Sequence, residues 1–228
     1  KYLVTGGAGF IGSHIVSTLL KQGRQVRVLD NFSSGKRENL KGLEVEILEG
    51  DLRDVSKVAQ AVKGVEIIFH EAAFVSVPES MEKPQECFDI NITGTSILFD
   101  AARKAGVKRV VIASSAAVYG DSEAYPLSEE TPLRQLSPYA TSKRVAEMYA
   151  ELFTHQFGLE VAALRYFNVY GPRQRPDSMY AAAVPIFIRC MLDQKPITIY
   201  GDGGQTRDLV NVRDVVQANF LASEHLAA

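Results

Sequence analysis

The sequence has little cysteine and no excess of charge of one sign. Its 228 residues include two cysteines, Cys87 and Cys190, which lie far apart and belong to no C-x-x-C pair. This usage indicates neither a disulfide framework nor a zinc site, so no metal is expected and both thiols should be reduced. With 25 Lys+Arg against 27 Asp+Glu, the net charge is −2. Neither nucleic acid nor an anionic membrane is therefore an expected partner.

Long hydrophobic runs are also absent. No run approaches the ~18 apolar residues that a membrane span requires. At 46% hydrophobic and 23% charged, the composition is that of an ordinary globular chain, which excludes a disordered, collagen-like or coiled-coil protein. We expect a cytosolic (cytoplasmic) protein.

Short β-branched runs alternate with helical patterns over most of the chain. Strands are predicted at about 2–5, 25–30, 44–48, 65–69, 108–113 and 160–165, and helices at about 11–22, 55–62, 86–104 and 138–157. Strands that are apolar on both faces and alternate with helices indicate an α/β fold, with a parallel sheet covered by helices on both sides. The fold class predicted is a doubly wound, Rossmann-like sheet.

The alternation of strand and helix patterns ends after Arg165. Glycine and proline indicate a long loop over 166–180, followed by a helix near 182–193, a short strand at 197–200 and a glycine-rich turn at 201–204. We therefore expect residues 1–165 to form the nucleotide-binding domain, and 166–228 to begin a smaller C-terminal substrate lobe interleaved with it. Because Lys1 directly precedes a strand and a helix over 215–226 has no stop signal, we expect a piece of a longer protein with an incomplete lobe.

A glycine motif lies where the first strand turns into the first helix. Gly6, Gly9 and Gly12 allow a tight turn and let backbone amides approach a pyrophosphate. Asp30 closes the next strand, where a carboxylate can bind the adenosine ribose, so NAD is favoured over NADP. Lys36 and Arg37 leave NADP open, because basic side chains there could accommodate a ribose phosphate.

Two further features carry open alternatives. Asp51, after the third strand, is either an adenine contact or a helix cap. Tyr139 and Lys143 are four residues apart at the start of a helix, which places them on the same face. They follow a strand that ends in Ser114 and Ser115, the order in which short-chain dehydrogenases/reductases present serine, tyrosine and lysine. The other interpretation is a surface Tyr-Lys pair on an amphipathic helix.

Several segments together resemble one family over nearly the whole chain. They are TGGAGFIGSH at 5–14, DNFSSGKRENL at 30–40, HEAAFVSVPES at 70–80, NITGT at 91–95, SSAAVYG at 114–120, SPYATSK at 137–143, LRYFNVYGPRQ at 164–174 and YGDGGQTRDLVNVRD at 200–214. They are similar to the extended short-chain dehydrogenases/reductases, and within these to the NAD-dependent UDP-sugar 4-epimerases. The resemblance implies NAD as cofactor, a UDP-sugar as substrate and a homodimer formed through the helices at 86–104 and 138–157.

The resemblance also implies roles for matching positions. Ser115, Tyr139 and Lys143 would be catalytic. The cofactor would be bound by Gly6, Gly9, Phe10, Ile11, Gly12, Asp30, Asn31, Phe32, Ser33, Ser34, Gly35, Asp51, Leu52, Ala72, Ala73, Asn91, Ser114, Tyr139, Lys143 and Phe167. The substrate would be bound by Ser76, Ser115, Tyr139, Asn168, Val184, Tyr200 and Arg207. Where many glucose-type epimerases have lysine this chain has Val75, which tilts the expected substrate slightly toward N-acetylhexosamines.

The choice of reaction depends on Ala116 and Ala117. Related 4,6-dehydratases have an Asp-Glu pair at these positions, and uronate decarboxylases keep a glutamate in the second of them. Alanines cannot transfer a proton, so 4-epimerisation through a transient 4-keto sugar is the expected reaction. A dehydratase or decarboxylase would need another carboxylate, such as Glu123 or Glu129. A non-catalytic NAD-binding regulator is a further alternative.

Overall fold

Six parallel strands form the central sheet of the protein. The structure is a computed structural model that describes residues 1–122, 125–175, 183–199 and 201–224. The strand order is β3-β2-β1-β4-β5-β6, and every neighbouring pair is parallel. The strands are β1 (Tyr2–Thr5), β2 (Val26–Asp30), β3 (Glu46–Glu49), β4 (Ile67–His70), β5 (Arg109–Ser115) and β6 (Glu160–Tyr166). The predicted Rossmann-like α/β fold is confirmed.

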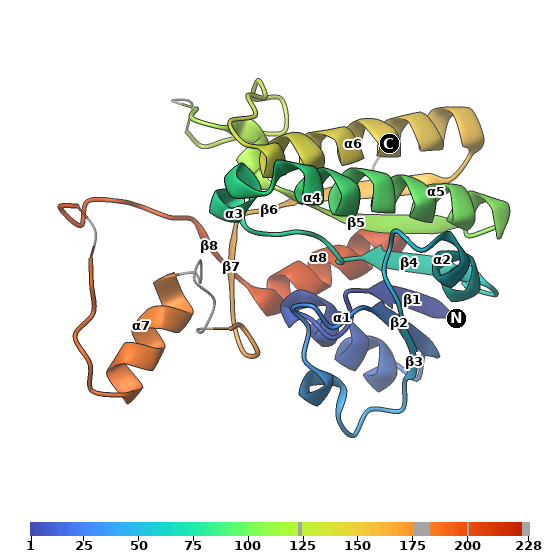
Figure 1. Ribbon diagram of the computed structural model, residues 1–228, viewed down its shortest axis with the longest axis horizontal. Coiled ribbons are helices and arrows are strands. Elements are labelled where there is room, and N and C mark those ends of the chain that lie inside the picture. Colours follow the sequence, from blue (N-terminus) through green and yellow to red (C-terminus); the bar gives the residue numbers. More distant parts are fainter. Residues whose placement is uncertain (123–124, 176–182, 200, 225–228) are drawn as a thin grey trace.

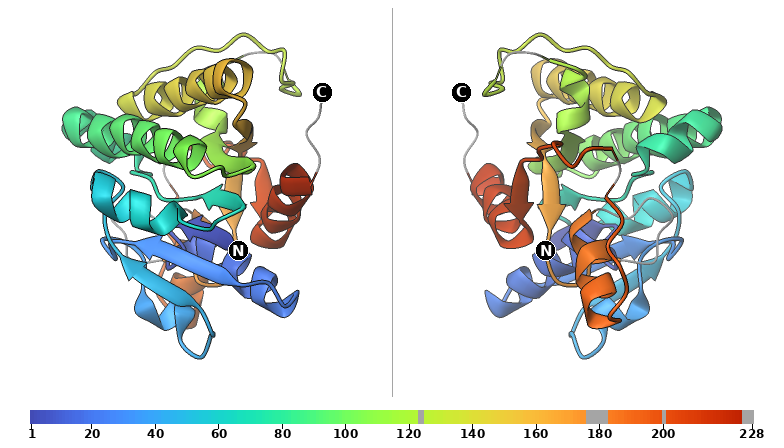
Figure 2. Two further views of the ribbon diagram at one scale, coloured as in Figure 1. Left: turned by 90° about the vertical axis from the view of Figure 1, so that its right-hand side faces the viewer. Right: turned by 90° about the vertical axis from the view of Figure 1, so that its left-hand side faces the viewer.

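Helices cover both faces of this sheet (Figures 1 and 2). α1 (Phe10–Lys21) and α8 (Val212–Glu224) lie on one face, over a core that includes Val28 and Phe69. α2 (Val55–Val62), α5 (Gly94–Lys104) and α6 (Pro138–Phe157) lie on the other face, over a core that includes Ile68 and Phe99. Each side chain buried in this way contributes about 1.5–3 kcal/mol. The two cores fix the parallel strands so that their carboxyl ends meet at one edge, where the functional side chains lie.

The segment between β4 and β5 is a broken helix rather than the single helix predicted over 86–104. It consists of α3 (Val77–Glu82), α4 (Pro84–Phe88), a π-helical turn (Asp89–Thr93) and α5. Proline at the start of both α3 and α4 suits the first helical turn, where its missing N–H costs nothing. A π-helical turn inside a helix frequently lies at a functional site.

α6 has the boundaries that the sequence predicts. Ser137 caps its start by accepting a hydrogen bond from Ala140 N at 3.1 Å, and Pro138 occupies the first turn. Gly158, with a φ of +68°, ends the helix in the left-handed conformation that glycine adopts freely. These signals fix the helix that carries Tyr139 and Lys143.

The C-terminal part adds a small second sheet. β7 (Asn168–Tyr170) pairs in parallel with β8 (Leu209–Asn211), and α7 (Ala183–Leu192) lies between them in sequence. The strand predicted at 197–200 is wrong for 197–199, which are exposed and form no strand, because β7 has β8 as its partner instead. The predicted turn at 201–204 is present, with positive φ at Gly201 and Gly203.

Candidate active site

Glycines build the turn between β1 and α1 because the backbone passes too close to itself for side chains. Gly9 N donates to Gly6 O at 3.0 Å, and a Cβ on Gly12 would lie 2.3 Å from that same oxygen. Gly6 has a φ of +65°, and a Cβ there would lie 2.7 Å from Ala72 N. α1 then begins at Phe10 with no side chain capping its first turn. Its uncapped N–H groups and positive dipole end suit the diphosphate of NAD.

Asp30 ends β2 beside this turn. Its buried carboxylate accepts hydrogen bonds from Ala8 N at 2.9 Å and Phe32 N at 2.8 Å, which leaves each oxygen a lone pair for a ribose hydroxyl. Arg37 forms an ion pair with Glu49, and its guanidinium lies 3.9 Å from the centre of the Phe32 ring. Arg37 thus has partners of its own beside the carboxylate that favours NAD.

Asp51 follows β3 and lines the same cleft. Its carboxylate binds the Arg53 guanidinium at 2.7 and 2.9 Å and accepts from Asn31 Nδ2 at 2.9 Å. These bonds, the one to Arg53 above all, hold the pKa of Asp51 far below its ordinary value. α2 is capped instead by Asp54, which accepts from Ser56 N at 2.9 Å. The helix-cap alternative for Asp51 is therefore wrong, and an adenosine contact remains its proposed role.

The serine, tyrosine and lysine meet where β5 ends against the first two turns of α6. Ser115 is the last residue of β5, and Lys143 Nζ donates to Ala113 O in the same strand at 2.7 Å. Lys143 Nζ also lies 5.8 Å from the centre of the Tyr139 ring. All three side chains line one cleft. The interpretation of Tyr139 and Lys143 as a surface pair is wrong, since Lys143 is buried.

Burial perturbs both groups of the Tyr139–Lys143 pair. It lowers the pKa of Lys143 to about 8. It raises the pKa of Tyr139, and the hydrogen bond with Ser115 offsets only part of this effect. Near neutral pH the phenol therefore carries its proton in the cofactor-free protein. Tyr139 can act as a base only when more positive charge lies beside it.

Asn91 forms hydrogen bonds that hold the helix carrying Tyr139 and Lys143. It lies in the π-helical turn, where its side chain accepts from Phe74 N at 2.7 Å and donates to Phe74 O at 3.0 Å. Its Nδ2 also donates to Ser142 Oγ at 2.9 Å. Asn91 thus connects the loop after β4 to α6, and the bulge of the π-helical turn supplies the place for it.

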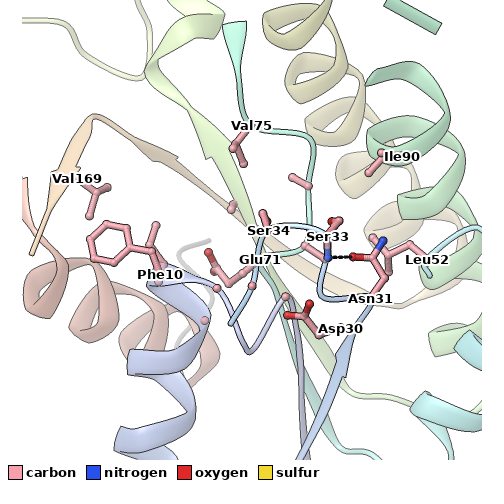
Figure 3. A pocket seen from close by; sticks show the side chains of 18 of the residues that line it. Phe10, Asp30, Asn31, Ser33, Ser34, Leu52, Glu71, Val75, Ile90 and Val169 are labelled. Atoms are coloured by element: carbon pink, nitrogen blue, oxygen red, sulfur yellow. Dashed lines mark hydrogen bonds between the residues drawn. The ribbon is translucent and has the colours of Figure 1, made fainter. Parts of the chain in front are cut away.

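The cleft has a volume of about 510 Å³ and collects most of the residues singled out from the sequence. From the predicted cofactor and catalytic set, its lining contains Gly6, Gly9, Phe10, Ile11, Gly12, Asp30, Asn31, Ser33, Ser34, Gly35, Asp51, Leu52, Ala72, Ala73, Ser114, Ser115, Tyr139, Lys143 and Phe167. Figure 3 shows part of this wall, including the hydrogen bond from Ser33 N to the Asn31 side chain.

Other predicted site residues lie outside this lining. Phe32 packs against the core, and Asn91 has the supporting place described above. Among the predicted substrate residues, Ser76 caps α3, Asn168 lies in β7 and Val184 lies in α7. Arg207 is exposed and donates to its neighbour's carbonyl. Tyr200, like Glu123, lies outside the described residues.

The cleft also contains residues that the sequence analysis did not single out. Glu71 follows β4, and Arg173 and Arg175 come from the loop after β7. Arg173 donates to Ser13 O in α1 at 2.9 Å, and Arg175 donates to Ser34 O at 3.3 Å. Two arginines that follow a Gly-Pro pair were the available signal, because guanidinium groups in a loop after a strand can bind a phosphate. Nothing in the sequence showed that Glu71 would be half-buried in the cleft.

Comparison with known proteins identifies the family. Residues 2–228 match the NAD dependent epimerase/dehydratase family. The UDP-glucose 4-epimerase of Mycolicibacterium smegmatis is 42% identical over 224 residues, covering 96% of this chain and 71% of that protein. The solved structure of UDP-N-acetylglucosamine 4-epimerase from Methanobrevibacter ruminantium M1, in complex with UDP-N-acetylmuramic acid, superposes with a TM-score of 0.95 at 42% identity, over 98% of this chain and 73% of that one.

Another reaction is represented among the similar structures. A double mutant of DesIV, a dTDP-glucose 4,6-dehydratase from Streptomyces venezuelae with NAD and DAU bound, has a TM-score of 0.89 and 36% identity, over 97% of this chain and 71% of that one. The chain belongs to the NAD dependent epimerase/dehydratase family, and NAD is its cofactor. The chain spans 71–73% of the length of these relatives.

Two kinds of feature are not found in the ranges that the structure describes. No three or more His, Cys, Asp or Glu side chains there are grouped so that they could hold a metal ion. None of the helices in those ranges combines the length and the apolar character needed to cross a membrane.

Proposed function

We propose that the protein is a 4-epimerase of a UDP-sugar. Bound NAD would supply a hydride acceptor, and after reduction a hydride donor, at carbon 4 of the sugar. Tyr139 would remove the proton from the hydroxyl at carbon 4, and Ser115 would hold that oxygen. Lys143, buried beside the tyrosine, would lower the pKa of the phenol through its positive charge. Rotation of the 4-keto sugar before the hydride returns would invert carbon 4, with no net redox change.

The absence of side-chain acids next to Ser115 carries this proposal. Ala116 and Ala117 begin the 3₁₀ turn Ala116–Tyr119, and Ser115 Oγ accepts from Ala117 N at 3.2 Å. Elimination of water needs a proton donor and acceptor close to carbons 5 and 6, and a methyl group can be neither. Reduction from the other face then remains as the fate of the ketone.

Carboxylates elsewhere give a dehydratase or decarboxylase weaker support. Glu129 is exposed and does not line the cleft, and Glu123 lies outside the described residues. Glu71 does line the cleft, but its Oε1 accepts a hydrogen bond from Tyr166 OH at 2.9 Å. A non-catalytic regulator is also less well supported, because it would have no use for Ser115, Tyr139 and Lys143 together in one cleft.

The two 4-epimerase relatives support a UDP-hexose or its N-acetylated form as the substrate. Asn168 and Arg207 would bind the diphosphate from the same end of the parallel β7–β8 pair, where Asn168 N donates to Asp208 O at 3.1 Å. Val75 lines the cleft with an exposed, uncharged side chain. An uncharged residue there fits the N-acetylhexosamine branch of the resemblance.

Two further parts of the proposal concern assembly and location. A homodimer would cover apolar side chains that α4 and α6 leave exposed, such as Phe88 and Leu152. Both cysteines are free thiols, as expected in the reducing cytoplasm.

The deciding experiment follows both product identity and product mass. Incubated with UDP-glucose and with UDP-N-acetylglucosamine, the protein should form the 4-epimer of one or both, with unchanged mass and no net accumulation of NADH. Tyr139→Phe, assayed in parallel, should form neither. Loss of water or carbon dioxide from the sugar would replace the epimerase proposal with a lyase. Binding of NAD without any conversion would favour the regulator.

A further inference from the structure

Glu71 occupies a wall of the cofactor cleft at the end of β4 (Figure 3). Its backbone is fixed, because Glu71 N donates to Thr5 O at 3.2 Å and a Cβ on Gly6 would lie 3.0 Å from Glu71 C. The side chain therefore starts from the same turn that would cradle the cofactor diphosphate. The catalytic role proposed above uses Ser115, Tyr139 and Lys143 and gives Glu71 no task.

A short chain of hydrogen bonds holds the Glu71 carboxyl. Tyr166 OH, at the end of β6, donates to Glu71 Oε1 at 2.9 Å. Asn219 Nδ2, from the middle of α8, donates to Tyr166 OH at 2.6 Å and to Val215 O at 2.8 Å. Asn219 is buried. The carboxyl thus receives one directed hydrogen bond from an uncharged group whose own position is fixed by α8.

The charged and titratable groups that act on Glu71 come from two neighbouring elements. Tyr166 belongs to β6, and Lys143 and Tyr139 belong to α6. Burial raises the pKa of Glu71 to about 7, against the smaller effects of Tyr166 and Lys143. The carboxyl therefore exists in both its neutral and its ionised form near neutral pH.

Strand order places Glu71 at the nicotinamide end of the cleft. In this fold the dinucleotide lies across the strand ends on both sides of β1, and Asp30 in β2 marks the adenosine side. Glu71 directly follows β4, which lies on the opposite side of β1 and next to the strand that ends in Ser115. A charge on Glu71 therefore acts where the cofactor ring gains and loses its positive charge.

We propose that the carboxylate of Glu71, when ionised, makes the cleft bind the oxidised cofactor more tightly than the reduced one. The oxidised ring is cationic and the reduced ring is neutral, so a nearby carboxylate attracts the first and not the second. In the neutral form this preference disappears. Through this carboxyl, pH sets how readily the bound cofactor accepts a hydride. The inference requires NAD binding only and does not depend on which sugar is the substrate.

The test measures the affinity of the cofactor-stripped protein for NAD and for NADH across pH. From about pH 5.5 to about pH 8.5, the ratio of the NADH Kd to the NAD Kd should rise about tenfold, the size expected for a unit charge several ångströms away in a partly screened interior. Glu71→Gln keeps an acceptor for Tyr166 OH and should remove the rise centred near pH 7, leaving only the rise near pH 8 that deprotonation of Lys143 causes. Glu66→Gln, an exposed change just before β4, should keep the wild-type rise.

A second variant changes the pKa of Glu71 while leaving its carboxyl in place. Because the Tyr166 hydrogen bond lowers the pKa of Glu71, Tyr166→Phe should move the midpoint of the rise to higher pH. A flat wild-type ratio, or an unchanged rise in Glu71→Gln, would overturn the proposal.

A direct titration covers the case in which Glu71→Gln fails to fold. Carbon-13 NMR of glutamate carboxyls in the cofactor-free protein should show one group that titrates near pH 7, and absence of such a group would overturn the proposal. None of these measurements involves a UDP-sugar. Their failure would leave the epimerase proposal standing, and a failed epimerase assay would leave them unaffected.

Discussion

The carboxylate of Glu147 in α6 receives the guanidinium of Arg165 in β6 on both of its oxygens, at 2.9 Å each. Ser114 Oγ, at the end of β5, donates to the same carboxylate at 2.5 Å. Glu147 is only 8% exposed. Glu147 lies one turn after Lys143, so the ion pair holds the catalytic turns of α6 against β6. The Ser114 hydrogen bond holds them against β5, the strand that carries Ser115.

Replacing Glu147 with alanine should destabilise the protein by about 3 kcal/mol, because it leaves the half-buried Arg165 without its partner. Urea unfolding at pH 7 measures this loss. Glu151→Ala, an exposed position on the same helix, is the control and should change stability by less than about 0.5 kcal/mol. Equal losses in both variants would contradict a special role for Glu147.

The Glu147 effect should also depend on pH. Burial alone would raise the pKa of Glu147, but hydrogen bonds from Arg165, Ser114 and Arg144 outweigh it and lower the pKa below the usual 4.5. A lowered carboxyl pKa stabilises the fold above the unfolded-state value, and this contribution is lost as pH falls through the folded-state value. The difference between wild type and Glu147→Ala should therefore shrink below about pH 4.5.

Tyr139→Phe should fold normally and retain NAD, since the ring stays in place and only the hydroxyl is lost. Epimerisation should fall by at least about 100-fold, the lower range of what a positioned base contributes. Product analysis by NMR, with cofactor content determined separately, measures both. Tyr149→Phe on the same helix lies outside the cleft lining and should keep wild-type activity. A fully active Tyr139→Phe would remove Tyr139 from the reaction.

Lys143→Met should lose activity, bind NAD more weakly and change how stability depends on pH. Burial lowers the pKa of Lys143 from 10.5 to about 8, so the fold favours its neutral form. Wild type therefore loses stability as pH falls from about 10.5 to about 8, and below that the loss is constant. The stability of the methionine variant relative to wild type should therefore increase as pH falls through this interval.

Unfolding midpoints at about pH 7, 8.5 and 10 test the Lys143 prediction. Lys104→Met is the control, because this lysine is exposed and pairs with Asp100 on the surface. Parallel curves for wild type and Lys143→Met would mean that the lysine is not desolvated.

Elements with a strong local pattern could be predicted from the sequence. α6 has a serine cap, proline in its first turn and glycine after its end, and both predicted ends agree with the structure. By contrast, β7 and β8 have three residues each, too few to show any alternation. The β-branched run at 197–199 predicted a strand, but no neighbouring strand pairs with it.

The site was predictable to the extent that its residues lie in motifs. The glycine turn and the Tyr-x-x-x-Lys spacing are local, so the sequence alone indicates Gly12, Tyr139 and Lys143. The perturbed carboxyl of Glu71 was not predictable. Its burial and its bond to Tyr166, which is 95 residues away in sequence, exist only once β4 and β6 lie in one sheet.

α4 and α6 lie side by side (Figure 1) and leave several large apolar side chains exposed. Among the large apolar residues of the segments 86–104 and 138–157, Leu98 and Phe99 in α5 and Phe153 in α6 are buried in the core. Phe88, Met148 and Leu152 are instead 49%, 53% and 46% exposed. A monomer rarely exposes large apolar side chains in such a group, and a second copy of the chain would cover them.

Leu152→Lys should therefore turn the proposed dimer into a monomer, because each two-fold-related copy would bring the same charge into the interface. Light scattering at micromolar concentration should give half the wild-type mass, with the circular dichroism spectrum unchanged. Val55→Lys places the same charge on an exposed valine in α2, away from this surface, and should remain dimeric. If wild type is itself monomeric across that range, the face has another function. If Val55→Lys also dissociates, the interface lies elsewhere.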